Sequence, residues 1–217
     1  MIKAVLFDID NTLLDFDAFV RQCLRKGFDR FSLGEYTDRV YEIFAQTNRE
    51  MWGAIEAGRM TYKDLMQNRF NCIFAQCGID FDGPTFEAFF CEDLFNNTIT
   101  MDGAVEILEY LRGRYVLCVA SNGPYAQQVN RLRLSGLLPC FSHLFISEQI
   151  GYAKPDRAFF LHCLNELALA PDEVLMVGDS YTSDICAAKA CGLKTCYLGK
   201  GDADWCVRSL WEIREIL

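Results

Sequence analysis

The chain has 217 residues, of which 51% are hydrophobic and 13% aromatic, enough to bury a sizeable core in one domain or in one domain with a large insertion. Its formal net charge of -9 at pH 7 argues against a nucleic-acid polymer or an anionic membrane surface as partner. We therefore expect a small ligand.

Short apolar runs along the chain predict the strands of a parallel sheet. They cover residues 4–7, 115–120, 144–147, 174–177 and 194–198. Helical patterns follow over residues 103–112, 124–134, 155–167, 182–190 and 205–217. Uniformly apolar strands that alternate with helices are typical of an α/β protein with a Rossmann-like parallel sheet.

The alternation is interrupted between the first and second predicted strands. This interval contains four helical patterns, over residues 16–33, 37–57, 62–77 and 84–96, and the pair Thr61 and Asp64 resembles a capping box at the third. A structureless loop of this length is implausible in a compact domain. We therefore predict a helical cap domain at residues 15–98, inserted into an α/β core made of residues 1–14 and 99–217.

The cysteines and the start of the chain favour a cytoplasmic location. The eleven cysteines are odd in number and form no C-x-x-C pair, and many lie in apolar segments, as do Cys72, Cys118, Cys163, Cys186 and Cys196. We expect most of them to be reduced core residues. The apolar run at residues 4–7 is too short for a signal peptide, and no window approaches the ~18 apolar residues of a membrane span.

Polar residues follow the ends of the predicted strands. Each has an ordinary structural explanation when taken alone, such as a helix cap for an aspartate or a solvated charge for a lysine. Their recurrence favours one shared site, because ligands of open parallel sheets bind outside the carboxyl ends of the strands. The residues are Asp8, Asp10 and Thr12; Ser121, Asn122 and Gly123; Lys154; and Asp179 with Asp184.

This ordered series resembles the four motifs of the haloacid dehalogenase-like phosphohydrolases, and it spans nearly the whole chain. The motifs read Asp8-Ile9-Asp10-Asn11-Thr12, Ser121-Asn122-Gly123, Lys154-Pro155 and Gly178-Asp179 with Asp184. The helical insertion looks like the first-position cap of that family. Many relatives carry glycine where Asn11 stands, and asparagine tolerates the left-handed conformation that such a turn uses.

The chemistry of phosphate monoesters gives roles to two of these acids. Asp8 can attack phosphorus and form an aspartyl-phosphate. Asp10, two residues on and on the same side of an extended chain, can protonate the leaving oxygen and later deprotonate water. Together with Asp179 they form an acidic cluster that requires a cation, and oxygen ligands beside a phosphate favour Mg²⁺.

The resemblance implies the remaining contacts. The metal is expected to take a carboxylate oxygen of Asp8, the backbone carbonyl of Asp10 and the carboxylate of Asp179, with Asp184 acting nearby. Lys154 and Ser121 are expected to contact phosphate oxygens. Thr12 and the backbone N–H groups around Ile9–Asp10 and Asn122–Gly123 complete the expected anion site.

Within the family, the chain looks most like the house-cleaning pyrimidine 5′-nucleotidases. The resemblance rests on Phe16-Asp17 and on residues 47–52 and 58–70. Phe16, Arg49 and Trp52 are suitable for holding a nucleoside monophosphate. A tryptophan on a helix between Phe44 and Ile55 is, however, more often a packing residue.

Other functions stay open. A sugar-phosphate phosphatase or a phosphomutase would share all four motifs. A haloacid dehalogenase is less favoured, because Asp10 would have no leaving group to protonate. A module that binds Mg²⁺ and a phosphorylated ligand without turnover is the alternative from outside the enzymes.

Overall fold

The structure is a computed structural model that describes all 217 residues. The chain forms two compact units. One contains Met1–Phe16 and Thr98–Leu217, and the other contains Asp17–Asn97. None of the helices combines the length and apolar character that a membrane crossing requires.

The first unit is built on a six-stranded parallel sheet with β1 near its centre. The strand order is β3-β2-β1-β4-β5-β6. Phe7, the last residue of β1, is in register with Val119 of β2 and Val177 of β4, so the carboxyl ends of these three strands lie side by side. The strands are β1 (Ala4–Phe7), β2 (Val116–Ser121), β3 (His143–Ile146), β4 (Val174–Gly178), β5 (Lys194–Leu198) and β6 (Trp205–Val207).

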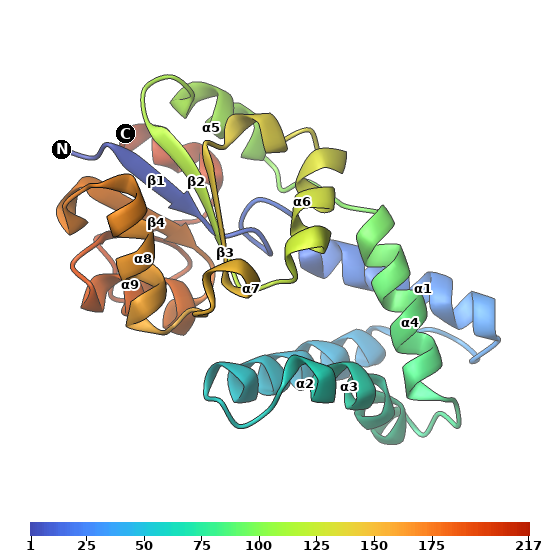
Figure 1. The fold of residues 1–217 in the computed structure, drawn as a ribbon. Helices are drawn as coiled ribbons and strands as arrows, with labels where there is room; N and C mark the ends of the chain where they lie inside the picture. Colours follow the sequence, from blue (N-terminus) through green and yellow to red (C-terminus); the bar gives the residue numbers. More distant parts are fainter. The chain divides into compact units, whose positions relative to one another are not determined.

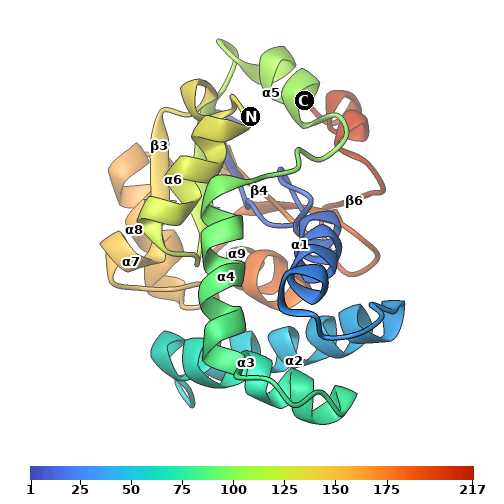
Figure 2. The ribbon, with the colours of Figure 1, turned by 90° about the vertical axis from the view of Figure 1, so that its right-hand side faces the viewer.

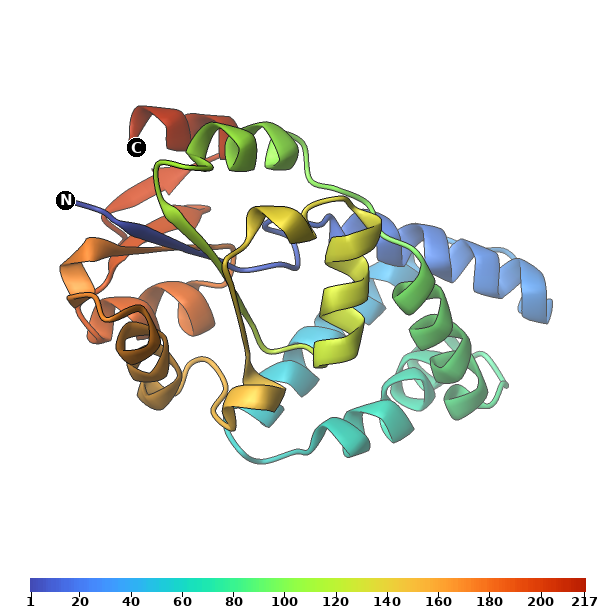
Figure 3. The ribbon, with the colours of Figure 1, turned by 45° about the horizontal axis from the view of Figure 1, so that its top comes forward.

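Helices cover both faces of this sheet (Figures 1 and 3). Val5 and Phe7 face a cluster that includes residues of α5 (Ala104–Leu111), α6 (Tyr125–Leu134) and the final 3₁₀ turn η4 (Leu210–Glu215). Ala4 and Leu6 face a second cluster, with residues of α8 (Arg157–Leu167) and α9 (Ala187–Ala190). The strands are apolar on both sides because both sides are covered.

The second unit is helical and has a core rich in aromatic rings. Its helices are α1 (Phe16–Phe31), α2 (Asp38–Glu56), α3 (Tyr62–Cys77) and α4 (Gly83–Asn96), and Figure 2 shows α4 crossing α3 at a steep angle. The Phe70 ring packs against Phe44, Phe86 and Phe90, at centroid distances of 5.9, 4.6 and 5.5 Å. The predicted capping box at Thr61 and Asp64 is confirmed.

The last part of the chain departs from the prediction. The segment 205–217, predicted as one helix, forms the short strand β6 and then η4. Cys196–Leu198 of β5 pairs with Trp205–Val207, because an unpaired strand edge offers hydrogen bonds that outweigh local helical preference. The predicted helix over residues 182–190 begins instead with a π-helical turn at Tyr181–Cys186.

The cysteines follow the prediction only in part. All eleven are free thiols. Cys118, Cys163 and Cys196 are buried as expected, whereas Cys72 and Cys186 are exposed. The apolar neighbours of these two residues in the sequence did not determine which way the helical side chains face.

Candidate active site

The loop after β1 places two carboxylates at the edge of the sheet. Asp8 continues the strand, since its N–H donates to the carbonyl of Val177 at 2.9 Å. The chain then turns at Asn11, whose φ of 56° lies in the left-handed region, as we expected for this residue. The carbonyl of Ile9 closes the turn by accepting the N–H groups of Leu13 and Leu14 at 2.9 Å each.

Lys154 lies at the centre of the acidic cluster and is 2% exposed. Its Nζ donates to Asp8 Oδ1 at 2.8 Å, to Asp184 Oδ1 at 2.6 Å and to the carbonyl of Ala120 at 2.7 Å. Burial opposes the charge on Lys154, but the carboxylates of Asp184 and Asp8 outweigh it and raise the pKa of the ammonium above its usual value. We expected this lysine to meet phosphate oxygens, whereas here its three protons are all donated to protein acceptors.

Asn122 fixes the segment that carries Lys154. Its side-chain Nδ2 donates to the carbonyl of Lys154 at 2.6 Å, and its Oδ1 accepts the N–H of Lys154 at 2.8 Å. The Asn122 amide thus pairs with both backbone groups of Lys154, as the backbone of a neighbouring strand would. The anion contact that we expect from the backbone around Asn122 stays a prediction, and the side chain of Asn122 has the separate role of positioning the lysine.

Asp179 and Asp184 bring two more carboxylates to Asp8. One oxygen from each of the three residues lies within 4.8 Å of the others. Burial raises the pKa of Asp8 to about 7 and that of Asp179 to about 8. The approach depends on Gly178, because a Cβ at that position would lie 2.2 Å from Asp184 Oδ2.

The donor set fits a magnesium ion. Carboxylate oxygens are the ligands that Mg²⁺ prefers. With all groups ionised, Asp8, Asp179 and Asp184 contribute three negative charges and Lys154 one positive charge, which leaves a net charge of -2 in a buried cluster. A divalent cation would cancel that charge and oppose the rise in the carboxyl pKa values.

Two residues of this site were not predicted from the sequence. Arg131 Nη1 lies 2.7 Å from Asp10 Oδ1, and Gln128 Nε2 donates to Asp10 Oδ2 at 3.0 Å. Both residues belong to α6 and are 1% exposed. The signal in the sequence was an arginine adjacent to the apolar Leu132 and three residues after Gln128, since a charge on the buried face of a helix needs a partner.

The other residues expected around the phosphate lie beside this cluster. The hydroxyl of Ser121 accepts from Gln128 Nε2 at 3.0 Å and from the N–H of Gly123 at 3.2 Å. The Gly123 N–H, which we expected to be free for an anion, is therefore in use. Thr12 is fully buried, and its hydroxyl has no hydrogen-bond partner.

The residues expected to hold a nucleoside are spread over both units. Phe16 ends the first segment of the sheet unit, and the guanidinium of Arg131 lies 6.0 Å from its ring centroid. Arg49 and Trp52 belong to α2 of the helical unit. Arg49 is exposed, and the ring of Trp52 packs against Tyr62 at a centroid distance of 5.9 Å.

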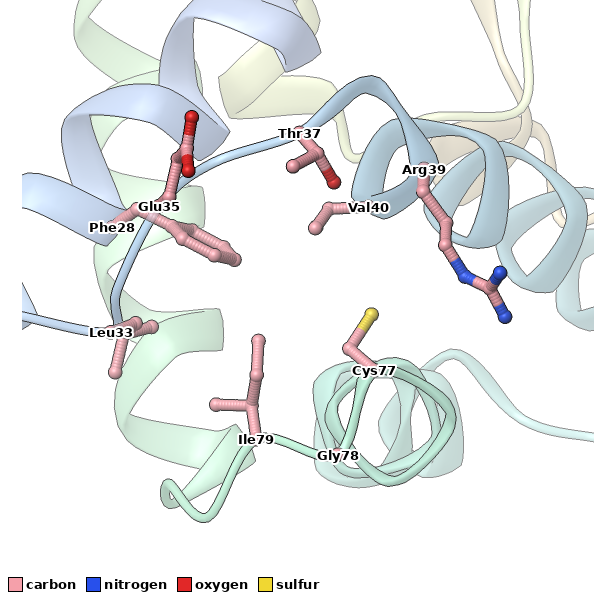
Figure 4. Close-up of a pocket in the computed structure, with 9 residues that line it drawn as sticks. All are labelled: Phe28, Leu33, Glu35, Thr37, Arg39, Val40, Cys77, Gly78 and Ile79. Carbon is pink, nitrogen blue, oxygen red and sulfur yellow. The ribbon is translucent and has the colours of Figure 1, made fainter.

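A pocket in the helical unit contains none of these residues (Figure 4). It has a volume of about 310 Å³ and lies among the end of α1, the start of α2 and the end of α3. Apolar side chains of Phe28, Leu33, Val40 and Ile79 face it. None of the residues of the acidic cluster lines it.

Two pyrimidine 5′-nucleotidases are similar in sequence to this chain over most of its length. The pyrimidine 5′-nucleotidase PynA of Streptococcus pneumoniae (strain ATCC BAA-255 / R6) is 33% identical over 195 residues, which cover 89% of this chain and 82% of PynA. The pyrimidine 5′-nucleotidase YjjG of Escherichia coli (strain K12) is 32% identical over 223 residues, which cover 98% of this chain and 96% of YjjG.

A solved structure has the same fold. The crystal structure of the HAD-hydrolase YfnB from Bacillus subtilis, bound to magnesium, superposes with a TM-score of 0.93 at 30% identity. The match covers 100% of this chain and 98% of that one. The family model of the haloacid dehalogenase-like hydrolases matches residues 2–192. The chain therefore belongs to the haloacid dehalogenase-like hydrolase family.

Proposed function

We propose that this hydrolase is a Mg²⁺-dependent phosphomonoesterase that acts on a nucleoside 5′-monophosphate through an aspartyl-phosphate on Asp8. The observation that carries the proposal is a cluster in which carboxylate oxygens of Asp8, Asp179 and Asp184 lie within 4.8 Å of one another, with the buried Lys154 paired to Asp8 and Asp184. Such a cluster is suited to a dianionic phosphoryl group held by a divalent cation. Both pyrimidine 5′-nucleotidase relatives support this choice of substrate.

In the first step, a carboxylate oxygen of Asp8 forms a bond to phosphorus while the ester P–O bond breaks. The leaving oxygen receives a proton from the carboxyl group of Asp10. Lys154 fixes the orientation of Asp8, because its Nζ is itself anchored by Asp184 and the Ala120 carbonyl. The nucleophile therefore has one preferred direction of attack.

In the second step, Asp10 takes a proton from a water molecule while the water oxygen forms a bond to phosphorus. The bond between phosphorus and the Asp8 oxygen breaks, which releases inorganic phosphate and restores the Asp8 carboxylate. The metal would be held by Asp8, the backbone carbonyl of Asp10 and Asp179, with Asp184 nearby, and when bound it offsets negative charge on the phosphoryl oxygens. The side chain of Asp10 is 36% exposed, so water can reach the group that must activate it.

We further propose that the helical unit is a cap over the α/β core. Phe16, Arg49 and Trp52 would then contact the nucleoside, and closure would exclude bulk water. Arg49→Met and Trp52→Leu should raise KM for UMP and leave KM for p-nitrophenyl phosphate unchanged. We also propose a cytoplasmic location, in keeping with eleven free thiols.

Turnover is tested by the release of inorganic phosphate from p-nitrophenyl phosphate, with Mg²⁺ and with EDTA. We expect activity only with Mg²⁺, and its loss in Asp8→Asn. Equal activity in that variant would reject the nucleophile, and inactivity of the natural protein would favour a binding module. The control is Asp172→Asn, a change of an exposed residue on the turn before β4.

The substrate is tested with a panel of UMP, dUMP, dTMP, purine monophosphates and hexose phosphates. We expect the highest kcat/KM for pyrimidine monophosphates. A clear preference for hexose phosphates would overturn the nucleotidase proposal while leaving the phosphomonoesterase intact. A product in which the phosphoryl group has moved within a sugar would indicate a mutase instead.

A further inference from the structure

The carboxylate of Asp10 is held from the protein side by two side chains of one helix. Arg131 Nη1 forms an ion pair with Oδ1 at 2.7 Å, and Gln128 Nε2 donates a hydrogen bond to Oδ2 at 3.0 Å, so each carboxylate oxygen has its own partner. Gln128 and Arg131 are both 1% exposed, whereas the Asp10 side chain is 36% exposed. The two partners therefore fix the orientation of the carboxylate and leave part of it accessible.

Arg131 and Gln128 are hydrogen-bonded to each other, and Gln128 is also hydrogen-bonded to Ser121 at the end of β2. Arg131 Nη1 donates to Gln128 Oε1 at 2.8 Å, and Gln128 Nε2 donates to Ser121 Oγ at 3.0 Å. The position of Gln128 also explains the glycine at 123, since a Cβ there would lie 2.3 Å from Gln128 Nε2. Contacts with Asp10, Ser121 and Arg131 thus hold the Gln128 amide in one orientation.

We propose that Gln128 and Arg131 are positioning residues that aim the Asp10 carboxyl group at the leaving oxygen. The inference rests on the proposed phosphomonoesterase function, in which Asp10 transfers the proton. A proton donor has to lie within about 2.6–3.2 Å of its target. A carboxylate on a loop that is free to rotate meets this requirement for only part of the time.

The leaving group reveals whether this positioning matters. The alkoxide released from UMP or glycerol 1-phosphate is a strong base and needs a proton as the ester bond breaks. The p-nitrophenolate ion is a weak base and leaves without one. Because kcat/KM reports the steps up to the first irreversible one, a poorly aimed Asp10 should lower kcat/KM for the alkyl phosphates more than for the aryl phosphate.

The experiment measures kcat/KM for UMP, glycerol 1-phosphate and p-nitrophenyl phosphate at saturating Mg²⁺. The variants are Arg131→Met, Gln128→Met and Arg131→Lys. The control is Arg133→Met, which lies on the same helix but is exposed and donates only to Asn130. Glycerol 1-phosphate makes the result independent of nucleoside recognition.

We expect Arg131→Met to lower kcat/KM for both alkyl phosphates about tenfold further than for p-nitrophenyl phosphate, as part of the 10²–10⁴-fold that a positioned acid supplies. Gln128→Met should show the same selectivity to a smaller degree. Arg131→Lys should recover part of the loss, because one charged donor remains. Arg133→Met should behave as the natural protein does.

Equal losses on alkyl and aryl substrates would overturn the inference, because a general structural defect does not depend on the leaving group. If circular dichroism shows that Arg131→Met does not fold, Gln128→Met decides the matter with the same ratio. A natural protein that hydrolyses none of the three esters would refute the proposed function instead. Hydrolysis of all three with a constant ratio across the variants would refute only the positioning role.

Discussion

Without divalent cations, the protein should lose about 3 kcal/mol of unfolding free energy as the pH rises from 5.5 to 7.5. The cause is the buried carboxyl pair of Asp8 and Asp179. Burial raises the pKa of Asp8 from an ordinary 3.8 to about 7 and that of Asp179 to about 8. Lys154 lowers both values and the neighbouring carboxylates raise them, but burial has the largest effect.

The sign follows from where the protons are. Between pH 3.8 and 7 the unfolded chain has released protons that the folded protein retains, so folding is favoured at low pH and this stability is lost as the pH rises toward the folded pKa values. Each retained proton is worth about 1.4 kcal/mol per pH unit. Since carboxylates whose oxygens lie within 4.8 Å of one another repel each other when both are ionised, we count one proton for both, which gives about 3 kcal/mol over two pH units.

The assay is urea unfolding followed by far-UV circular dichroism in EDTA at pH 5.5, 6.5 and 7.5. Asp179→Asn should flatten the dependence, because an amide has no charge to bury. Mg²⁺ at one hundred times its dissociation constant should restore about 2.7 kcal/mol at pH 7.5. Exposed carboxyls with a lowered pKa, such as Asp64 and Asp82, are ionised throughout this range and do not contribute. A level or rising stability in EDTA would refute the reasoning.

Three substitutions test the packing. Glu87→Gln leaves the buried guanidinium of Arg69 without its carboxylate, and it should cost about 3–5 kcal/mol in urea unfolding; a loss below 1 kcal/mol would contradict this. Gly178→Ala places a Cβ 2.2 Å from Asp184 Oδ2, so it should lower phosphatase activity and cost about 1–3 kcal/mol; unchanged activity would count against it. Gly53→Ala, inside α2, adds a carbon that meets nothing within 4 Å beyond its chain neighbours and the backbone of its own helix, and should raise stability by about 0.5–1 kcal/mol in the same assay; a lower midpoint would contradict the helical conformation.

The sheet could be predicted because its strands are defined by local sequence. Strand β1 has the predicted bounds, Ala4–Phe7, and all four of its residues are buried, since a fully buried strand must be apolar along its length. Strand β6 could not be predicted, because its three residues, Trp205–Val207, are too few to show a period. It exists because the edge of β5 is available for pairing, which is a property of the assembled sheet.

The same contrast holds in the candidate site. Asp8 and Asp179 could be proposed from sequence because each follows a strand, and the ends of parallel strands meet at one edge. Gln128 lies 118 positions from Asp10 along the chain. The sequence around each residue therefore does not show that the two side chains contact each other. Lys154 was proposed for phosphate, whereas its three contacts with Asp8, Asp184 and the Ala120 carbonyl could be seen only once the strands were placed.

The two buried cations divide the carboxylates into separate groups, and this division can account for two different roles within three residues of sequence. Lys154 pairs with Asp8 and Asp184, while Arg131 pairs with Asp10. The Asp8 side chain is 13% exposed and that of Asp10 is 36% exposed. A nucleophile benefits from low hydration and a fixed direction, whereas a proton carrier must exchange with water during each turnover. Because the cations come from different elements, one from the loop before α8 and one from α6, each carboxylate can be oriented without disturbing the other.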